Sequence, residues 1–368
     1  MKRILIIGGM VLAVAVTSLH LQAAAGLKLA QGEVEVLYEF INPVPAGMVT
    51  PEGIALDRKG NIYVSLRTTD GISYIKNEIV KFTPKGDISV LADLGPAAPG
   101  GFGVIGLTTD ADGNVYVAFP SFNAAHGVWK VYPDGSAEHL NGSWQLLIPN
   151  SLNFDNEGNL FVTDWDPFKV TAAGIWKYGA DTMVFEPWCV DPLIMALDDD
   201  PFGQPIGGAN GIAFHPPDNI YVSNTEQGTI VRVPVLEDGT AGVASVINLD
   251  PFPIMNPDGV TVDAHGNVYT VIPVSTWRDF PPAPPPWLLS PIVKIYPDTG
   301  MVEPILDPVL FDDPLYFDFP TTLAFGTGPL DKKSVFVISM GAEFFFGPPG
   351  TGPKLTQVGV GVPGRTGQ

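Results

Sequence analysis

One phrase, repeated six times, constrains the fold of this chain more than any other feature. Each copy contains an apolar strand, a turn with glycine or asparagine, and a second strand rich in β-branched and aromatic residues. A repeated hairpin of this kind is the signature of an array of identical β units. The copies are PEGIALDRKGNIYVS from Pro51, VIGLTTDADGNVYVA from Val104, PNSLNFDNEGNLFVT from Pro149, ANGIAFHPPDNIYVS from Ala209, PDGVTVDAHGNVYTV from Pro257 and PTTLAFGTGPLDKKSVFVIS from Pro320.

Further strand-like runs follow each copy, for example EIVKFTP from Glu78, so each unit holds four strands and predicts one propeller blade. The last unit has a third strand, KLTQVGVGV from Lys354, but no fourth. The run EVEVLYEFI from Glu33 supplies the missing strand and removes an exposed sheet edge. We therefore predict an all-β, six-bladed β-propeller whose ring is closed by the N-terminal strand.

An aspartate ends the first strand in four of the copies. Its carboxylate can cap the backbone of the turn, and the glycine that follows supplies the positive φ that the turn needs. We expect these aspartates to hold the hairpins rather than to bind a ligand. They are Asp57, Asp110, Asp155 and Asp263.

The first 25 residues have the pattern of an export signal. Lys2 and Arg3 precede an apolar run that is too short for a comfortable transmembrane helix, and small residues of a cleavage site follow at 23–25. We predict a signal peptide at residues 1–25, a single propeller domain at residues 26–368, and no stable membrane span. An uncleaved signal-anchor is the alternative. The single cysteine, Cys189, cannot form an internal disulfide, and an exported protein without disulfides fits a bacterial periplasm or the exterior better than an animal secretory route.

Acidic residues dominate the charge. The chain has 39 Asp and Glu against 19 Lys and Arg, a formal net charge of −20. Without a basic stripe there is nothing to neutralise phosphates, so a nucleic-acid partner is excluded. The balance favours binding of a cation.

The second residue of each copy is the most informative position, because the first strand of each blade lines the central channel. These residues share one level, and we expect no cation of the protein there. Four of them offer hard oxygen ligands with two negative charges, which suit calcium, although another divalent cation is an alternative. Asn-Gly and Asp-Gly are also common turn dipeptides, so a turn role competes with a metal role. In blade order the residues are Glu52, Ile105, Asn150, Asn210, Asp258 and Thr321.

The repeated phrases and the Glu, Asn, Asn, Asp series resemble the regucalcin/gluconolactonase family, the senescence-marker-protein type. Diisopropylfluorophosphatases and paraoxonases are more distant relatives. The resemblance implies a calcium-dependent hydrolase of lactones, esters or phosphoesters. In it Glu52, Asn150, Asn210 and Asp258 hold the metal, and Asp258 is also the general base or nucleophile. Sugar-lactonase members carry an arginine where this chain has Ile148, so we expect a less polar substrate.

Aromatic residues collect in the loops expected on the metal side, with Arg67 and Arg278 among the few cations there. They indicate a pocket for an apolar or aromatic small molecule, or a surface that docks a protein. A non-enzymatic binding module with a structural calcium ion is therefore the alternative function. The pocket residues that we predict are Ile105, Ile148, Asp164, Trp165, Trp277 and Thr321, and the wider rim includes Phe122, Phe168, Trp188, Phe280, Trp287 and Phe344–Phe346.

Overall fold

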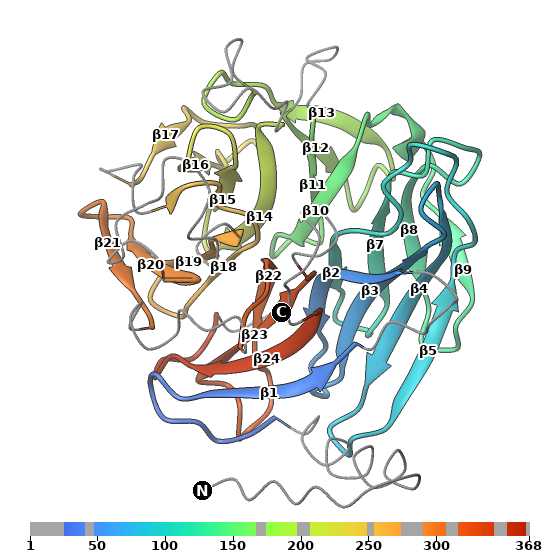
Figure 1. Cartoon of the computed structure of the whole chain (residues 1–368). Coiled ribbons are helices and arrows are strands. Elements are labelled where there is room, and N and C mark those ends of the chain that lie inside the picture. The colour runs from blue at the N-terminus through green and yellow to red at the C-terminus, as the bar shows by residue number, and fades with distance from the viewer. Residues whose placement is uncertain are drawn as a thin grey trace, which may run out of the picture.

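Six four-stranded antiparallel sheets surround a central axis, as the face-on view shows (Figure 1). The structure is a computed structural model that describes residues 26–40, 48–166, 174–196, 207–248, 254–273, 290–306, 316–341 and 352–365. The predicted six-bladed β-propeller is confirmed. The predicted signal peptide lies outside the described residues. Within the described ranges, no helix has the length and apolar character needed to cross a lipid bilayer.

The first three blades follow one another directly along the chain, each running from the axis outward. A turn of 3₁₀ helix, η1 (Ser143–Gln145), lies between the second and third blades. Blade one holds β2 (Met48–Leu56), β3 (Ile62–Thr69), β4 (Tyr74–Phe82) and β5 (Ile88–Asp93). Blade two holds β6 (Leu107–Thr109), β7 (Val115–Phe119), β8 (Gly127–Val131) and β9 (Ala137–His139). Blade three holds β10 (Pro149–Phe154), β11 (Leu160–Asp164), β12 (Gly174–Tyr178) and β13 (Phe185–Cys189).

The last three blades repeat the arrangement, except that blade six takes its outer strand from the start of the chain. Blade four holds β14 (Ala209–His215), β15 (Asn219–Asn224), β16 (Thr229–Pro234) and β17 (Ser245–Val246). Blade five holds β18 (Val260–Val262), β19 (Val268–Val271), β20 (Ile292–Tyr296) and β21 (Met301–Pro304). Blade six holds β22 (Pro320–Phe325), β23 (Ser334–Ser339), β24 (Lys354–Gly359) and β1 (Val34–Glu39).

The N-terminal strand closes the ring, as predicted. β1 pairs antiparallel with β24, from Val34 opposite Val358 to Glu39 opposite Lys354. The preceding segment continues the contact, since the Gly32 N–H donates to the Gly359 carbonyl at 2.9 Å. The first and last strands of the fold therefore share one sheet, which covers the edge of β24.

In four of the six blades, an aspartate at the end of the first strand caps the turn that follows. In blade one, Oδ1 of Asp57 accepts from the backbone N–H groups of Lys59 and Asn61, both at 2.9 Å. Its Oδ2 accepts from the Asn61 amide at 2.7 Å and the Tyr63 hydroxyl at 3.0 Å. Asp110 and Asp263 make the same four contacts in blades two and five. The predicted capping role is confirmed, and it explains the repeated Asp-x-x-Gly-Asn-x-Tyr pattern.

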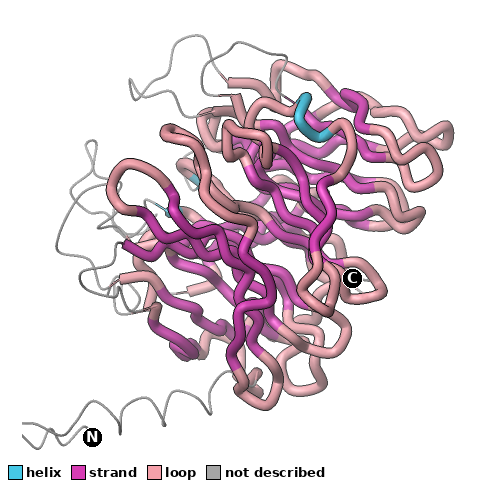
Figure 2. The backbone as a smooth tube through the Cα atoms, turned by 90° about the vertical axis from the view of Figure 1, so that its right-hand side faces the viewer, coloured by secondary structure: helices cyan, strands magenta, loops and turns pink. Residues whose placement is uncertain are grey.

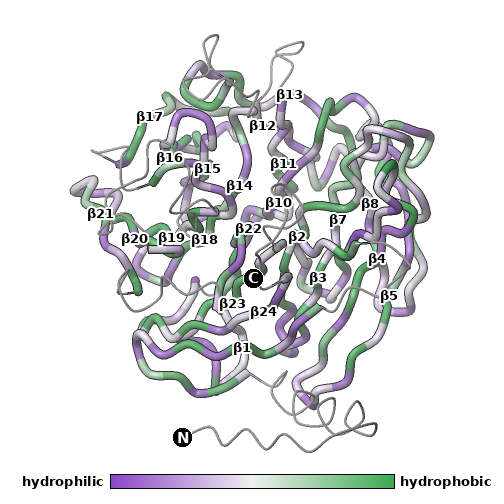
Figure 3. Tube along the Cα trace, in the orientation of Figure 1, coloured by the Kyte–Doolittle hydropathy of each residue, from purple (hydrophilic) through white to green (hydrophobic). Residues whose placement is uncertain are grey.

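Six apolar clusters fill the six junctions between neighbouring blades. Each draws residues from two adjacent sheets, as when Phe161 of blade three packs with Phe214 of blade four. The same holds at the other five junctions, including the one between blades six and one. The alternation of hydrophobic and hydrophilic residues along the strands is visible in Figure 3. The core therefore consists of six apolar clusters, one between each pair of neighbouring blades. The view turned by 90° shows the strands running between the two faces of the ring (Figure 2).

The last described residues of the tail, 362–365, lie across the end of the channel that is opposite to the predicted site level. Gly364 bridges to Asp263, and the Arg365 N–H donates to the Val262 carbonyl at 3.4 Å. The Arg365 guanidinium donates to Asn153 Oδ1 at 3.2 Å and to the Phe154 carbonyl at 3.3 Å. The tail therefore ties the inner strands of blades three and five together.

Removing the packing of the closing strand should destabilise the whole ring. Leu37 on β1 is fully buried between blades six and one, so Leu37→Ala should lower the free energy of unfolding by about 3 kcal/mol. Glu35→Ala, on an exposed position of the same strand, is the matched control and should be nearly neutral. Thermal denaturation measures both. Equal melting temperatures for the two variants would contradict closure by β1.

Removing the charge of the tail should also destabilise the fold. Arg365→Met keeps much of the stem over the Phe214 ring but removes two charged hydrogen bonds, at a cost of about 2 kcal/mol. Lys59→Met, at an exposed position of a blade-one turn, is the control. Urea denaturation compares them, and the same midpoint in both variants would show that the tail contributes nothing.

Candidate metal centre

A closed ring of hydrogen bonds between blades surrounds the axis at the predicted site level. The second residue of every copy accepts, through its backbone carbonyl, one hydrogen bond from the preceding blade. The donors to Asn150 and Thr321 are the N–H groups of Gly106 and Gly259, at 3.0 and 2.8 Å. The donors to the other four are hydroxyls: Thr321 to Glu52 at 3.0 Å, Ser65 to Ile105 at 2.5 Å, Thr163 to Asn210 at 2.5 Å, and Ser223 to Asp258 at 2.6 Å.

In blades one, three and four the contact is relayed by a hydroxyl on the second strand. The Gly211 N–H donates to Ser223 Oγ at 2.7 Å, and Ser223 then donates to Asp258 of the next blade. Ser65 relays from the N–H of Gly53 in the same way, and Thr163 relays from that of Ser151. These hydroxyls recur four residues after the asparagine of the turn, a signal that the repeats carry.

The residue after the site residue is glycine because the backbone of the next blade approaches it closely, and not because the chain turns there. A Cβ at Gly53 would lie 2.1 Å from the Ile105 carbonyl oxygen, and one at Gly211 would lie 2.5 Å from that of Asp258. Neither glycine has a positive φ, and Asn210-Gly211 lies inside β14. The turn interpretation of these dipeptides is therefore wrong, because the glycine admits the neighbouring backbone.

Irregular pairing of the first strand accompanies the site residue. Regular register between the first and second strands is lost from Pro51 to Ile54, from Pro149 to Leu152 and from Ala209 to Ile212. The same occurs from Pro320 to Thr322 in blade six. Such irregularities re-aim side chains near functional sites. In these blades the irregularity includes Glu52, Asn150, Asn210 or Thr321.

Glu52 forms a buried ion pair with Arg67, which corrects the expectation of no cation at this level. Arg67 Nη2 contacts Glu52 Oε2, and their side chains are 4% and 21% exposed. Burial raises the pKa of the Glu52 carboxyl, while the charge and hydrogen bond of Arg67 lower it. The prediction missed that the β2–β3 register pairs Thr50 with Arg67, which brings Arg67 near Glu52. A single cation within the strand IYVSLRTT was the available signal.

Asp258 and Asn210 form a second pair of interacting side chains at the predicted site level. Burial raises the pKa of Asp258 well above its ordinary value, and the charge of Glu52 raises it further. The Asn210 side chain hydrogen-bonds to Asp258, and its Nδ2 also donates to Thr225 Oγ1 at 3.0 Å. Thr225 in turn donates to the Pro257 carbonyl at 2.8 Å. The amide nitrogen is thus engaged, which leaves Oδ1 of Asn210 as an acceptor.

The remaining predicted pocket residues mostly support the site. Ile148 is fully buried between blades two and three, and its N–H donates to Asp164 Oδ1 at 2.8 Å. Asp164 also accepts from the Leu147 N–H at 3.0 Å, and burial raises the pKa of its carboxyl to about 6. This carboxyl therefore fixes the segment that leads to Asn150. Trp165 is half-buried, with its indole N–H buried and unpaired within the described ranges, and Trp277 lies outside them.

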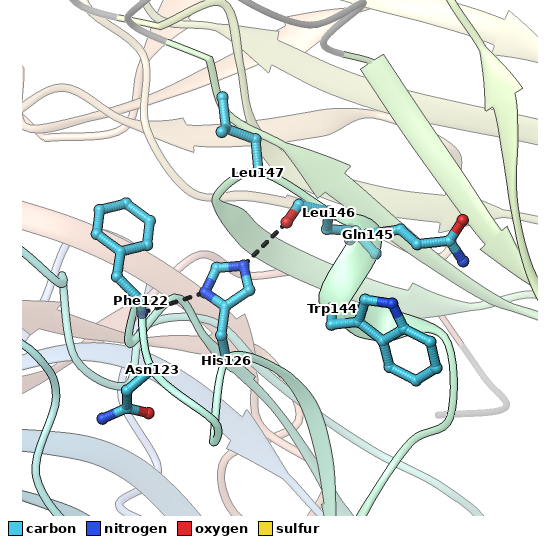
Figure 4. A pocket seen from close by; sticks show the side chains of 7 residues that line it. All are labelled: Phe122, Asn123, His126, Trp144, Gln145, Leu146 and Leu147. Carbon is cyan, nitrogen blue, oxygen red and sulfur yellow. Dashed lines mark hydrogen bonds between the residues drawn. The ribbon is translucent and has the colours of Figure 1, made fainter.

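A surface cavity of about 440 Å³ lies between the β7–β8 loop and η1, and none of the six axial residues lines it (Figure 4). His126 lies between its two sides, accepting from the Phe122 N–H at 3.3 Å and contacting the Leu146 carbonyl through Nε2 at 2.9 Å. Phe122 packs edge-on against Phe102, and Phe102 packs against Trp165. Phe122, Asn123, His126, Trp144, Gln145, Leu146 and Leu147 line the cavity.

The wider rim is described only in part. Trp188 does not belong to it, because its indole N–H donates to the Gly239 carbonyl in the β16–β17 connection, on the opposite face. The other rim residues lie outside the described ranges: Phe168, Trp277, Arg278, Phe280, Trp287 and Phe344–Phe346.

The donors at the axis fit a hard divalent cation. Two carboxylates and two amides supply oxygen only, as calcium prefers. Arg67 balances one negative charge, while Asp258 has no ion-pair partner among the described residues. Within those ranges no three His, Cys, Asp or Glu side chains converge, so a metal would need the amides of Asn150 and Asn210 as well.

Part of the chain matches a known protein family. Residues 136–278 match the family model described as SMP-30/Gluconolactonase/LRE-like region. The family resemblance seen in the sequence is confirmed. The matched region includes Asn150, Asn210 and Asp258, whereas Glu52 lies before it. No curated protein matches the chain.

Solved structures show the same fold at low sequence identity. A putative gluconolactonase is 15% identical, with 92% of this chain and 96% of that chain covered and a TM-score of 0.61. A gluconolactonase from Xanthomonas campestris is 17% identical, with 91% of each chain covered and a TM-score of 0.57. The calcium-binding protein regucalcin from Agrobacterium tumefaciens is 16% identical, with 87% of this chain and 92% of that chain covered and a TM-score of 0.56.

Breaking one relay of the axial ring should destabilise the fold. Ser223→Ala leaves the Gly211 N–H and the Asp258 carbonyl without their shared partner, at a cost of about 2–4 kcal/mol. Ser89→Ala, on an exposed position of β5, removes a hydroxyl outside the ring and is the control. Chemical denaturation measures both variants. A loss no larger than that of the control would contradict the importance of the relay.

Proposed function

We propose that this chain is an exported calcium-dependent hydrolase of the lactonase or arylesterase kind. The family match supports a lactonase-type propeller, and solved structures with the same fold include a gluconolactonase and a calcium-binding regucalcin. The observation that carries the proposal is the acidic pair at the axis. The ring of hydrogen bonds places Glu52 and Asp258 at one level around the axis, and within the described ranges no cation pairs with Asp258. A divalent ion would relieve the repulsion between the two carboxylates.

Glu52, Asn150, Asn210 and Asp258 would hold the metal. When bound, calcium supplies a Lewis acid that polarises the carbonyl oxygen of the substrate. Asp258 would act as the base that takes a proton from the attacking water. The water oxygen bonds to the carbonyl carbon, the ester C–O bond breaks, and the proton passes to the leaving oxygen. A nucleophilic role for Asp258 is the alternative.

An apolar or aromatic substrate suits the surroundings of this site. Ile148 occupies the position at which sugar-lactonase members carry arginine, and it lies in the core. Phe102, Phe122 and Trp165 form a connected aromatic group beside the 440 Å³ cavity. An aromatic ester or a lactone with an apolar chain could bury that part of itself there.

The Asp258→Asn variant tests this proposal. It should reduce hydrolysis of phenyl acetate and of apolar lactones at least about 100-fold, because the amide cannot accept the proton. The fold should survive, since the ring contact of this residue uses its backbone carbonyl. Asp298→Asn, on an exposed position of the same blade, makes the same charge change away from the site and should keep full activity.

The outcomes separate the two functions. Loss of turnover in Asp258→Asn alone supports the hydrolase. Full activity in that variant would overturn the assigned base. Calcium binding by calorimetry, without turnover of any ester or lactone by the parent protein, would favour a binding module with a structural calcium ion.

A further inference from the structure

Arg67 is held as a fixed charge rather than as a mobile surface side chain. Its Nη1 donates to the Phe102 carbonyl at 2.7 Å, and its Nη2 lies 3.7 Å from the sulfur of Met340. The guanidinium carbon lies 4.8 Å from the centre of the Tyr74 ring. These contacts come from blades one and six and from the segment that leads into blade two. They position the charge independently of Glu52.

The backbone leaves room for this side chain. Gly103 has a φ of +74°, and a Cβ there would lie 2.7 Å from Cδ of Arg67 and 2.5 Å from Oδ1 of Asn77. Asn77 in turn accepts from the Val104 N–H at 2.9 Å, which fixes the segment that carries Gly103. A residue that is only 3% exposed, with a glycine beside its stem, is built into the fold.

The positive charge of Arg67 offsets part of the negative charge at the axial site. Without it, Glu52 and Asp258 would place two negative charges together in a partly buried channel, which is costly unless a positive group is near. With it, the group carries one net negative charge. The ion pair uses Oε2 of Glu52, so Oε1 remains for another partner.

We propose that Arg67 is an internal counter-cation that stabilises the site when no metal is bound and lowers its affinity for divalent ions. This inference rests on the proposed metal site and deepens it. Two positive charges that share one carboxylate repel each other, and this repulsion is strong where water is partly excluded. Arg67 therefore sets the cation concentration at which the site fills.

The test compares the parent protein with Arg67→Met and Arg67→Lys by calorimetric titration with calcium chloride at about pH 8, where carboxylates are ordinarily ionised. Arg67→Met should bind calcium at least about tenfold more tightly, because the competing charge is gone. Arg67→Lys keeps the charge and should stay within about threefold of the parent. Equal or weaker binding by Arg67→Met would overturn the proposal.

Thermal unfolding gives an independent readout. In EDTA, Arg67→Met should melt below the parent, and calcium should raise its melting temperature by more than it raises that of the parent. If Arg67→Met folds only with calcium, unfolding on chelation meets the same expectation. The double variant Glu52→Gln with Arg67→Met should recover stability in EDTA relative to Arg67→Met, and no recovery would count against the proposal.

The parent protein separates failure of this inference from failure of the metal site. If neither the parent nor Arg67→Met binds calcium, the proposed site fails and Arg67 is only a structural ion pair. If the parent binds and Arg67→Met binds equally well, the metal site stands and only the counter-cation role is lost.

Discussion

The closed ring of hydrogen bonds around the axis is the interaction on which the rest of the structure depends. Each blade gives one donor to the next blade's carbonyl, so the position of one inner strand fixes that of its neighbour. The carbonyls belong to the residues whose side chains form the candidate site. The contact that assembles the propeller therefore also sets the level of Glu52, Asn150, Asn210 and Asp258. Site geometry and blade packing are consequences of the same bonds.

This coupling explains how an acidic pair can persist at the centre of a β fold. The ring of backbone contacts and the apolar clusters between blades stabilise the assembly. The fold can therefore tolerate the repulsion between the two carboxylates at the axis. Arg67 moderates that cost at Glu52 but not at Asp258. Asp258 therefore remains without a balancing positive charge among the described residues, whereas Asp57 accepts from four donors and holds its turn.

Much of the fold could be predicted because the repeats encode it locally. The alternating strands, the turn aspartates and the missing outer strand of blade six all follow from short patterns, and β1 occupies the predicted place. The axial level followed from aligning the copies. The Arg67–Glu52 pair could not be read in this way, because it depends on the hairpin register and on contacts from blades six and two. The glycines were open to misreading for a related reason: their constraint comes from a neighbouring blade.

The C-terminal tail makes the two ends of the central channel different. Residues 362–365 lie across the end of the channel that is remote from Glu52 and Asp258, and the inner strands there enclose a cavity of only about 50 Å³, which is room for little more than water. The two faces of the ring are therefore not equivalent for access to the acidic pair, because the tail and the inner strands stand in the way on one of them.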